Sequence, residues 1–195
     1  MKTFFQFCFY VFSRRVKLFA FLNAVYFCSL FVTAFVASLF FVPPPYEGQL
    51  PEFLVPYLGE NLSWLFFKVF LFNLVLSAFV FVTLPGLVFF PLSAVALLVR
   101  AVLWGLLLYQ LPTSVFLIVL PTFVFEGEAW VLAALAGTCL GASWFKPAWM
   151  YGGEGLSRRD ALKRMLKECE CVYFLVILFL LVGAFVEVLT IAFSV

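Results

Sequence analysis

The chain has 195 residues, and its composition excludes a soluble globular domain. Hydrophobic residues make up 66% of it and charged residues 11%, whereas soluble domains contain about 45–50% and about 25%. With 29 phenylalanines and a mean hydropathy of +1.17, the chain carries more apolar surface than one small core can bury. The net charge of +2 is too small to indicate a nucleic-acid partner. We therefore expect an all-α protein that crosses a membrane several times.

Residues 1–17 form an aromatic N-terminal segment. Its apolar part, from Phe4 to Phe12, precedes the basic cluster of Arg14, Arg15 and Lys17. A secretory signal peptide has the opposite order, so we expect residues 1–17 to lie at the membrane interface. A first span over about residues 18–42 ends at three consecutive prolines.

Residues 43–63 form the next polar segment and contain Glu47, Glu52 and Glu60 but no lysine or arginine. Two further spans are predicted over about residues 64–84 and 87–109, since each has the roughly 20 apolar residues that a bilayer requires. Residues 43–63 are therefore expected to form an extracytoplasmic loop.

The fourth apolar segment, about residues 112–145, is too long for one span and too short for two. Pro121 and the sequence Glu126-Gly127-Glu128 interrupt it, so we expect a broken or re-entrant helix over 112–125 and a fuller helix over 129–145. Gly137 and Gly141 permit close helix contact. Such contact within the molecule is the simpler interpretation, and a homo-oligomer is the alternative.

Residues 146–170 are more polar and are predicted to form a cytoplasmic segment. Ser157 and Asp160 have the spacing of a capping box at a helix start. The apolar residues that follow share one helix face, which predicts a basic amphipathic helix lying on anionic membrane lipids. Its basic residues are Arg158, Arg159, Lys163, Arg164 and Lys167.

A fifth span over about residues 172–193 completes the predicted topology. Basic residues precede the first span and the fifth, and five crossings place both groups on the same side. By the positive-inside rule, the N-terminus is then cytoplasmic and the C-terminus outside. Cys169 and Cys171 lie on the cytoplasmic side in this arrangement, where thiols are reduced.

Four charged residues lie within the predicted spans, where each costs at least about 2.5 kcal/mol unless it has a partner or water. They are Arg100, Glu126, Glu128 and Glu187. One interpretation is an ion pair and a neutral carboxyl group that lock the bundle. The alternative is a wet, acidic cavity that passes a proton or cation, or receives a basic group of a partner.

The sequence contains no pattern that indicates an enzyme. Histidine is absent, the five cysteines have no zinc-binding spacing, and no nucleophile or phosphate-binding motif is present. We therefore expect no catalytic residue, no metal and no cofactor.

Two glutamate motifs carry a family resemblance. Residues 121–129 read Pro-Thr-Phe-Val-Phe-Glu-Gly-Glu-Ala, and residues 184–187 read Ala-Phe-Val-Glu. In order and spacing they resemble the stage II sporulation protein M family, whose signature is close to Pro-His-Gly-aliphatic-Phe-Glu-aliphatic-Pro-Ala with a later Ala-Phe-Ile-Glu. The resemblance covers about residues 60–190, and the positions that carry over are Pro121, Phe125, Glu126, Ala129, Phe185 and Glu187.

The resemblance implies an integral membrane fold and a role in organising partners. In spore-forming bacteria the family acts as a membrane anchor for peptidoglycan-degrading partners, whereas relatives elsewhere have no such role. Thr122 and Phe123 replace the family's His-Gly pair, so this chain resembles a divergent, non-sporulation relative. We expect a scaffold that docks other membrane or extracytoplasmic proteins. The alternative is a permease-like subunit of a transporter that uses the Arg/Glu cluster.

Overall fold

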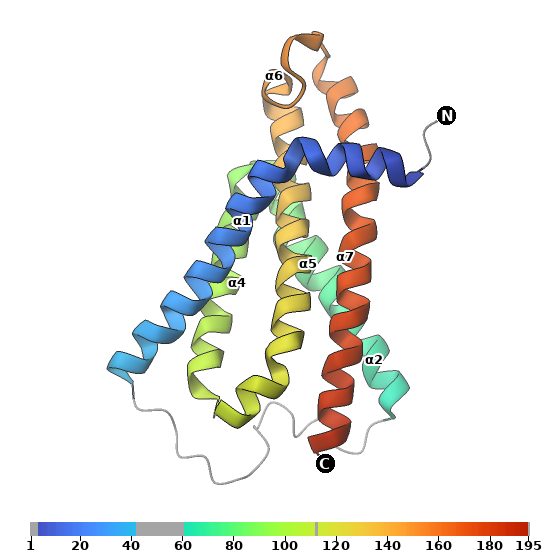
Figure 1. Ribbon diagram of the computed structural model, residues 1–195. Coiled ribbons are helices and arrows are strands. Elements are labelled where there is room, and N and C mark those ends of the chain that lie inside the picture. The colour runs from blue at the N-terminus through green and yellow to red at the C-terminus, as the bar shows by residue number, and fades with distance from the viewer. Residues whose placement is uncertain (1–3, 42–60, 112, 195) are drawn as a thin grey trace.

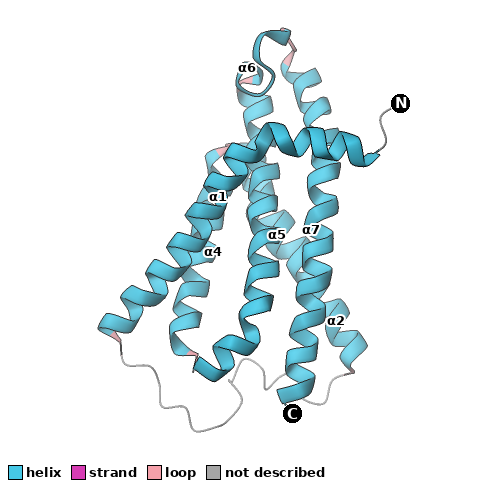
Figure 2. Ribbon diagram, in the orientation of Figure 1, coloured by secondary structure: helices cyan, strands magenta, loops and turns pink. Residues whose placement is uncertain are grey.

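The computed structural model describes residues 4–41, 61–111 and 113–194, and in this part of the chain every regular element is a helix (Figures 1 and 2). Five helices are long and apolar enough to cross a membrane, which confirms the predicted number of spans. The predicted acidic loop lies outside the described residues except for 61–63. The spans are Phe4–Phe40, Leu62–Val88, Pro91–Gln110, Val115–Phe145 and Arg158–Ala192.

The helices begin where local capping chemistry favours a start. Asn61 Oδ1 accepts hydrogen bonds from the backbone amides of Ser63 and Trp64 at 2.9 and 3.3 Å, and Pro91 occupies the first turn of its helix. The elements in chain order are α1 (Phe4–Phe40), α2 (Leu62–Leu71), the π-helix η2 (Phe72–Thr83), α3 (Leu84–Val88), α4 (Pro91–Gln110), α5 (Thr113–Phe145), α6 (Pro147–Tyr151), the 3₁₀ helix η3 (Gly152–Glu154) and α7 (Arg158–Ser194).

Helix α5 forms the centre of the bundle. It packs against α1, η2, α3, α4 and α7, and the eight residues 129–136 on it are all buried. Most of them are alanine or leucine. Because lipid is as apolar as these side chains, close van der Waals packing between small residues holds such helices together.

Gly137 and Gly141 provide the closest of these approaches. A Cβ atom on Gly137 would meet Ser93 Oγ and, at 2.6 Å, the backbone oxygen of Thr83; a Cβ atom on Gly141 would meet the backbone oxygen of Gly86. The small-residue face of α5 therefore packs against α3 and α4 of the same molecule. This confirms the intramolecular interpretation of the glycine pair.

The structure corrects the expectation of a break in the fourth apolar segment. Residues 113–145 form one continuous helix that contains Pro121, and Figure 1 shows this helix turning sharply near its start instead of breaking. Proline bends a helix by removing one donor and crowding the preceding turn. Gly127 is helical as well, and a Cβ atom there would lie 2.7 Å from Cε1 of Tyr26 on α1. The glycine thus permits helix packing and does not end the helix.

The structure also corrects the expectation that the basic helix lies on the membrane surface. Helix α7 runs without interruption from Arg158 into the last span, and its cap is the predicted one: Ser157 Oγ lies 2.6 Å from Asp160 Oδ2 and accepts from its amide at 3.2 Å. Ala161 and Met165 on its apolar face are 0% and 1% exposed, because protein covers this face. In Figure 1 this part of α7 and α6 extend beyond the crosswise start of α1. We call residues 146–170 the projecting end.

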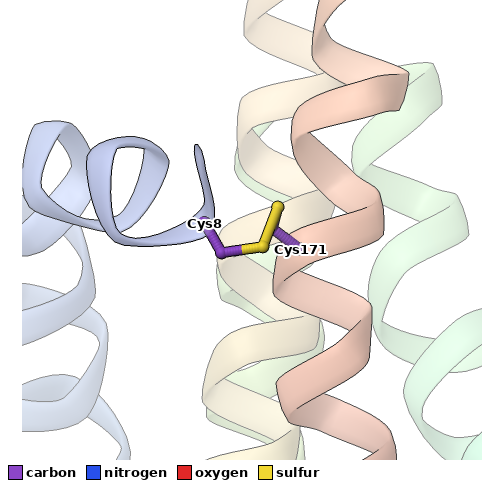
Figure 3. The surroundings of a disulfide bond; sticks show 2 residues. All are labelled: Cys8 and Cys171. Atoms are coloured by element: carbon purple, nitrogen blue, oxygen red, sulfur yellow. A yellow bond between two sulfur atoms is a disulfide. The ribbon is translucent and has the colours of Figure 1, made fainter. Parts of the chain in front are cut away.

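The start of α1 lies across the bundle, and a disulfide attaches it to α7. Figure 1 shows its first turns running over α5 and α7 before the helix turns down beside α4. Figure 3 shows the bond between Cys8 and Cys171, whose Cα atoms are 5.1 Å apart. Cys171 was expected to be reduced, so this bond is a correction; Cys169 remains a free, buried thiol. No local sequence pattern predicts that the N-terminal segment reaches α7.

Candidate functional site

Three of the four predicted intramembrane charges line one cavity of about 460 Å³. Arg100 comes from α4, Glu126 from α5 and Glu187 from α7. Glu128 does not line this cavity: its side chain faces Asn23 on α1, because residues two apart on a helix do not share a face. The other lining residues are Lys68, Val69, Phe72, Asn73 and Trp104.

The two carboxyl groups in the cavity lie next to each other. Glu126 is 1% exposed, and its side chain lies beside that of Glu187. Asn73 Nδ2 donates a hydrogen bond to Glu126 Oε1 at 2.6 Å. The lack of a side chain at Gly183 on α7 leaves space for Glu126, since a Cβ atom there would lie 3.0 Å from Glu126 Cγ.

Arg100 lies beside this pair but forms no salt bridge with a carboxylate among the described residues. Its guanidinium carbon lies 4.2 Å from the centre of the Trp130 ring and 6.0 Å from that of Phe81. Arg100 Nε and Nη2 are buried without a hydrogen-bond partner. The ion pair that would lock the bundle is therefore not formed; a cation–π contact takes its place.

Further buried polar atoms without partners lie on the elements around Arg100. They include Tyr26 Oη on α1 and, on α5, Thr122 Oγ1 and Trp130 Nε1, while Arg15 Nε and Thr138 Oγ1 lie elsewhere on the same two helices. Thr122, Glu126 and Trp130 are four residues apart and share one face of α5. An unpaired polar atom in hydrocarbon costs free energy, so this concentration of them marks the region as a candidate site.

The cavity wall also includes a length of unusual backbone. Asn73 lies in η2, whose π-helical hydrogen bonds span five residues, and such segments occur often at functional sites. Tyr26, Trp104 and Trp130 were not predicted from the sequence. Among so many aromatic residues these three have no distinguishing pattern, apart from the four-residue spacing of Trp130 from Glu126.

A second polar cluster joins α1 to the projecting end. Arg15 Nη2 donates to Glu168 Oε2 at 3.1 Å, and the side chains are 10% and 6% exposed. Arg164 Nε lies 3.5 Å from the other oxygen of Glu168 and also pairs with Glu154. Both arginines also form cation–π contacts with the ring of Tyr151. Burial raises the pKa of the Tyr151 hydroxyl, so this group stays neutral.

Five apolar spans, of which α5 is the central one, define a polytopic, all-α membrane protein. The family model described as Stage II sporulation protein M matches residues 19–190 of the chain. The chain therefore belongs to the stage II sporulation protein M family, as the two glutamate motifs predicted. No curated protein and no solved structure matches the chain.

The family motif residues have unequal surroundings in the structure. Glu126 and Ala129 are buried in the bundle centre, whereas Phe185 is 56% exposed on the outer side of α7. Phe125 contacts Phe179 of α7 at 6.1 Å between ring centres, and Pro121 lies within α5. Only Glu126 and Glu187 of the motif line the cavity.

Proposed function

We propose that the protein is a non-enzymatic, multi-pass membrane scaffold that docks a partner protein on its projecting end. The observation that carries this proposal is a groove of about 530 Å³ on the outward side of α7. Its lining has three basic and two acidic residues around one apolar side chain, Leu166, which is 52% exposed. The lining residues are Asp160, Lys163, Arg164, Leu166, Lys167 and Glu170.

The surface chemistry of the projecting end favours a partner with an acidic surface. Arg158, Arg159, Lys163 and Lys167 are all exposed, and long-range attraction between opposite charges speeds encounter and fixes the orientation of two proteins. Trp149 is 57% exposed on α6, and tryptophan and arginine are the residue types that contribute most to protein interfaces.

The groove is also preorganised, which favours binding. Arg164 pairs with Glu154 of η3 and with buried Glu168, and Tyr151 Oη lies 3.7 Å from Met165 Sδ inside the projecting end. A rigid surface loses little conformational freedom when a partner binds. The projecting end is thus better suited to docking than a flexible tail of the same charge.

A crosslinked pull-down from native membranes tests the docking role. We expect a specific partner that the wild type captures to be lost by a variant in which Arg158, Arg159, Lys163 and Lys167 become glutamine. Arg164 is left intact because of its ion pairs. The matched control is the Glu126→Gln/Glu187→Gln double variant, which should keep the partner. Retention of the partner by the projecting-end variant would contradict the proposal.

We propose that the N-terminus and the projecting end face the cytoplasm and that the C-terminus lies outside. The basic residues of both segments support this orientation by the positive-inside rule. Lys163 and Lys167, which are exposed on the projecting end, provide the test. A membrane-impermeant amine reagent is expected to modify them in inverted vesicles and leave them unmodified in right-side-out vesicles. Modification only in right-side-out vesicles would reverse the orientation.

The intramembrane cavity supports a second candidate function, passage of a solute by a permease-like subunit. Helix irregularities and charges near the middle of the membrane are features that transporters use, and η2 and the Glu126–Glu187 pair provide both. Flux measurements in liposomes with the wild type and the Glu126→Gln/Glu187→Gln variant distinguish this role from docking, because a scaffold leaves flux at background.

A further inference from the structure

The start of α1 crosses the other helices instead of running beside them (Figure 1). We call residues 4–17 the crosswise segment. Three contacts attach it to α7, namely Phe4 with Phe174, Cys8 with Cys171 and Arg15 with Glu168. These contacts extend over about three turns of α1 but only about two turns of α7. The crosswise segment therefore meets α7 at one level of the bundle, close to Cys171.

This level coincides with the edge of the apolar part of α7. Residues 172–192 contain Glu187 as their only charged residue, and at 1.5 Å per residue they extend about 30 Å. That length matches the hydrocarbon core of a bilayer. On the other side of Cys171, more than half of residues 158–170 are charged. The hydrocarbon layer therefore ends where the crosswise segment lies.

The crosswise segment has one face against protein and one exposed apolar face. Since residues three or four apart share a helix face, the face on the bundle consists of Cys8, Val11 and Arg15, of which Val11 is 2% exposed. The apolar face is uncovered: Phe5 and Phe9 are 71% and 78% exposed, and Val16 on the same side is 48% exposed. At the edge of the hydrocarbon layer, such a face contacts lipid.

A third face of the crosswise segment is polar and basic. Arg14 and Lys17 are exposed and three residues apart, with Ser13 beside them. Arg14 Nη1 donates to Tyr10 Oη at 3.2 Å, and the guanidinium carbon lies 5.6 Å from the centre of the Tyr10 ring. This contact holds the guanidinium group on the exposed side of the helix. An arginine in such a position can bind two phosphate oxygens at once.

We propose that the crosswise segment lies in the membrane plane and binds the phosphate groups of anionic phospholipids through Arg14 and Lys17. Helices that bind in this way place an apolar face at the edge of the acyl layer and a basic face among the headgroups. The basic helix of α7 does not meet this description, because protein covers its apolar face. The proposal is independent of the docking role, since the groove on α7 consists of other residues.

Thermal unfolding of the full chain in nanodiscs tests the proposal, with phosphatidylglycerol added in increasing fractions to phosphatidylcholine. A ligand that binds only the folded state raises the unfolding midpoint, so phosphatidylglycerol is expected to raise that of the wild type. Each basic residue near an anionic membrane surface adds to the attraction. We therefore expect the apparent affinity for phosphatidylglycerol to fall by about tenfold or more in the Arg14→Gln/Lys17→Gln variant.

Two control variants separate headgroup binding from net charge and from packing. Arg158→Gln/Arg159→Gln removes the same charge about 20 Å beyond Cys171 along α7, which exceeds the Debye length of about 10 Å at an ionic strength of about 0.1 M. This variant is expected to respond to phosphatidylglycerol as the wild type does. The exchange Arg14→Lys/Lys17→Arg keeps both charges and is expected to retain the response.

Three results would overturn the proposal. The first is a wild-type midpoint that does not change with phosphatidylglycerol. The second is an equal response of the wild type and the Arg14→Gln/Lys17→Gln variant, which would show that the lipid acts elsewhere. The third is loss of a protein partner from this variant in the pull-down without any change in its response to phosphatidylglycerol. That result would assign the basic face of the crosswise segment to a protein instead of a lipid.

Discussion

Replacing Gly141 with leucine is expected to prevent the bundle from assembling. A Cβ atom at this position would meet the backbone oxygen of Gly86 and, at 2.9 Å, the Cα atom of Phe90. Backbone atoms cannot rotate away as a side chain can, so the whole α3–α4 connection would have to move from α5. Overpacking typically costs 1–3 kcal/mol, and with backbone as the obstacle we expect a loss of about 3 kcal/mol or more.

The measurement is the fraction of protein that elutes as a single species after mild detergent extraction, together with its unfolding midpoint. Ala20→Leu is the matched control, because it adds a comparable side chain on the exposed side of α1. We expect this control to behave as the wild type. If Gly141→Leu eluted and unfolded as Ala20→Leu does, the close packing of α5 against Gly86 would be wrong.

The sequence was sufficient to predict the five spans because a membrane requires long apolar stretches, and these are local properties of the chain. The capping box at Ser157 was predictable for the same reason, since its partners are three residues apart. The predicted break in α5 was wrong because proline and glycine are ambiguous signals. Gly127 reads as an interruption in the sequence, but it is a contact point for Tyr26 in the structure.

The candidate site was predictable only in part. Arg100, Glu126 and Glu187 are unusual residues in their spans, so each could be identified alone. Whether they meet, and which of them pair, depends on how the helices rotate about their axes. An arginine–carboxylate ion pair was therefore one of two interpretations that the sequence allowed, whereas in the structure Arg100 stacks on Trp130 and Glu126 lies beside Glu187. Glu128 was included because it is adjacent in sequence, although it faces another helix.

The predictions of a membrane-surface helix and of a reduced Cys171 were wrong for a related reason. The apolar side chains of residues 158–170 predicted a membrane-surface helix, and their spacing was correct. However, an apolar stripe does not reveal whether lipid or protein covers it, and here α5, α6 and α1 cover it. The disulfide between Cys8 and Cys171 joins residues 163 positions apart, and no local signal connects them.

Removing the carboxylate of Glu168 is expected to be among the most damaging changes outside the bundle centre. Glu168→Leu would leave Arg15 buried without its partner, since the Arg15 side chain is 10% exposed and its Nε already lacks a hydrogen bond. Breaking a buried ion pair on one side typically costs about 3–5 kcal/mol. We expect a loss in this range, measured as the change in the free energy of unfolding by denaturant titration in detergent micelles.

Two controls separate the effect of an unpaired buried charge on stability from the effect of altered packing. Glu154→Leu breaks the ion pair between Glu154 and Arg164, in which the Glu154 side chain is 46% exposed. This change is expected to lower the free energy of unfolding by at most about 1 kcal/mol. The double variant Arg15→Leu/Glu168→Leu is expected to recover part of the stability, because no buried charge is then left unpaired. If the double variant were as unstable as the two single changes combined, the ion pair would not explain the loss.

Because this pair joins the start of α1 to α7, the Glu168→Leu variant should also lose partner capture in the pull-down, even with every exposed basic residue intact.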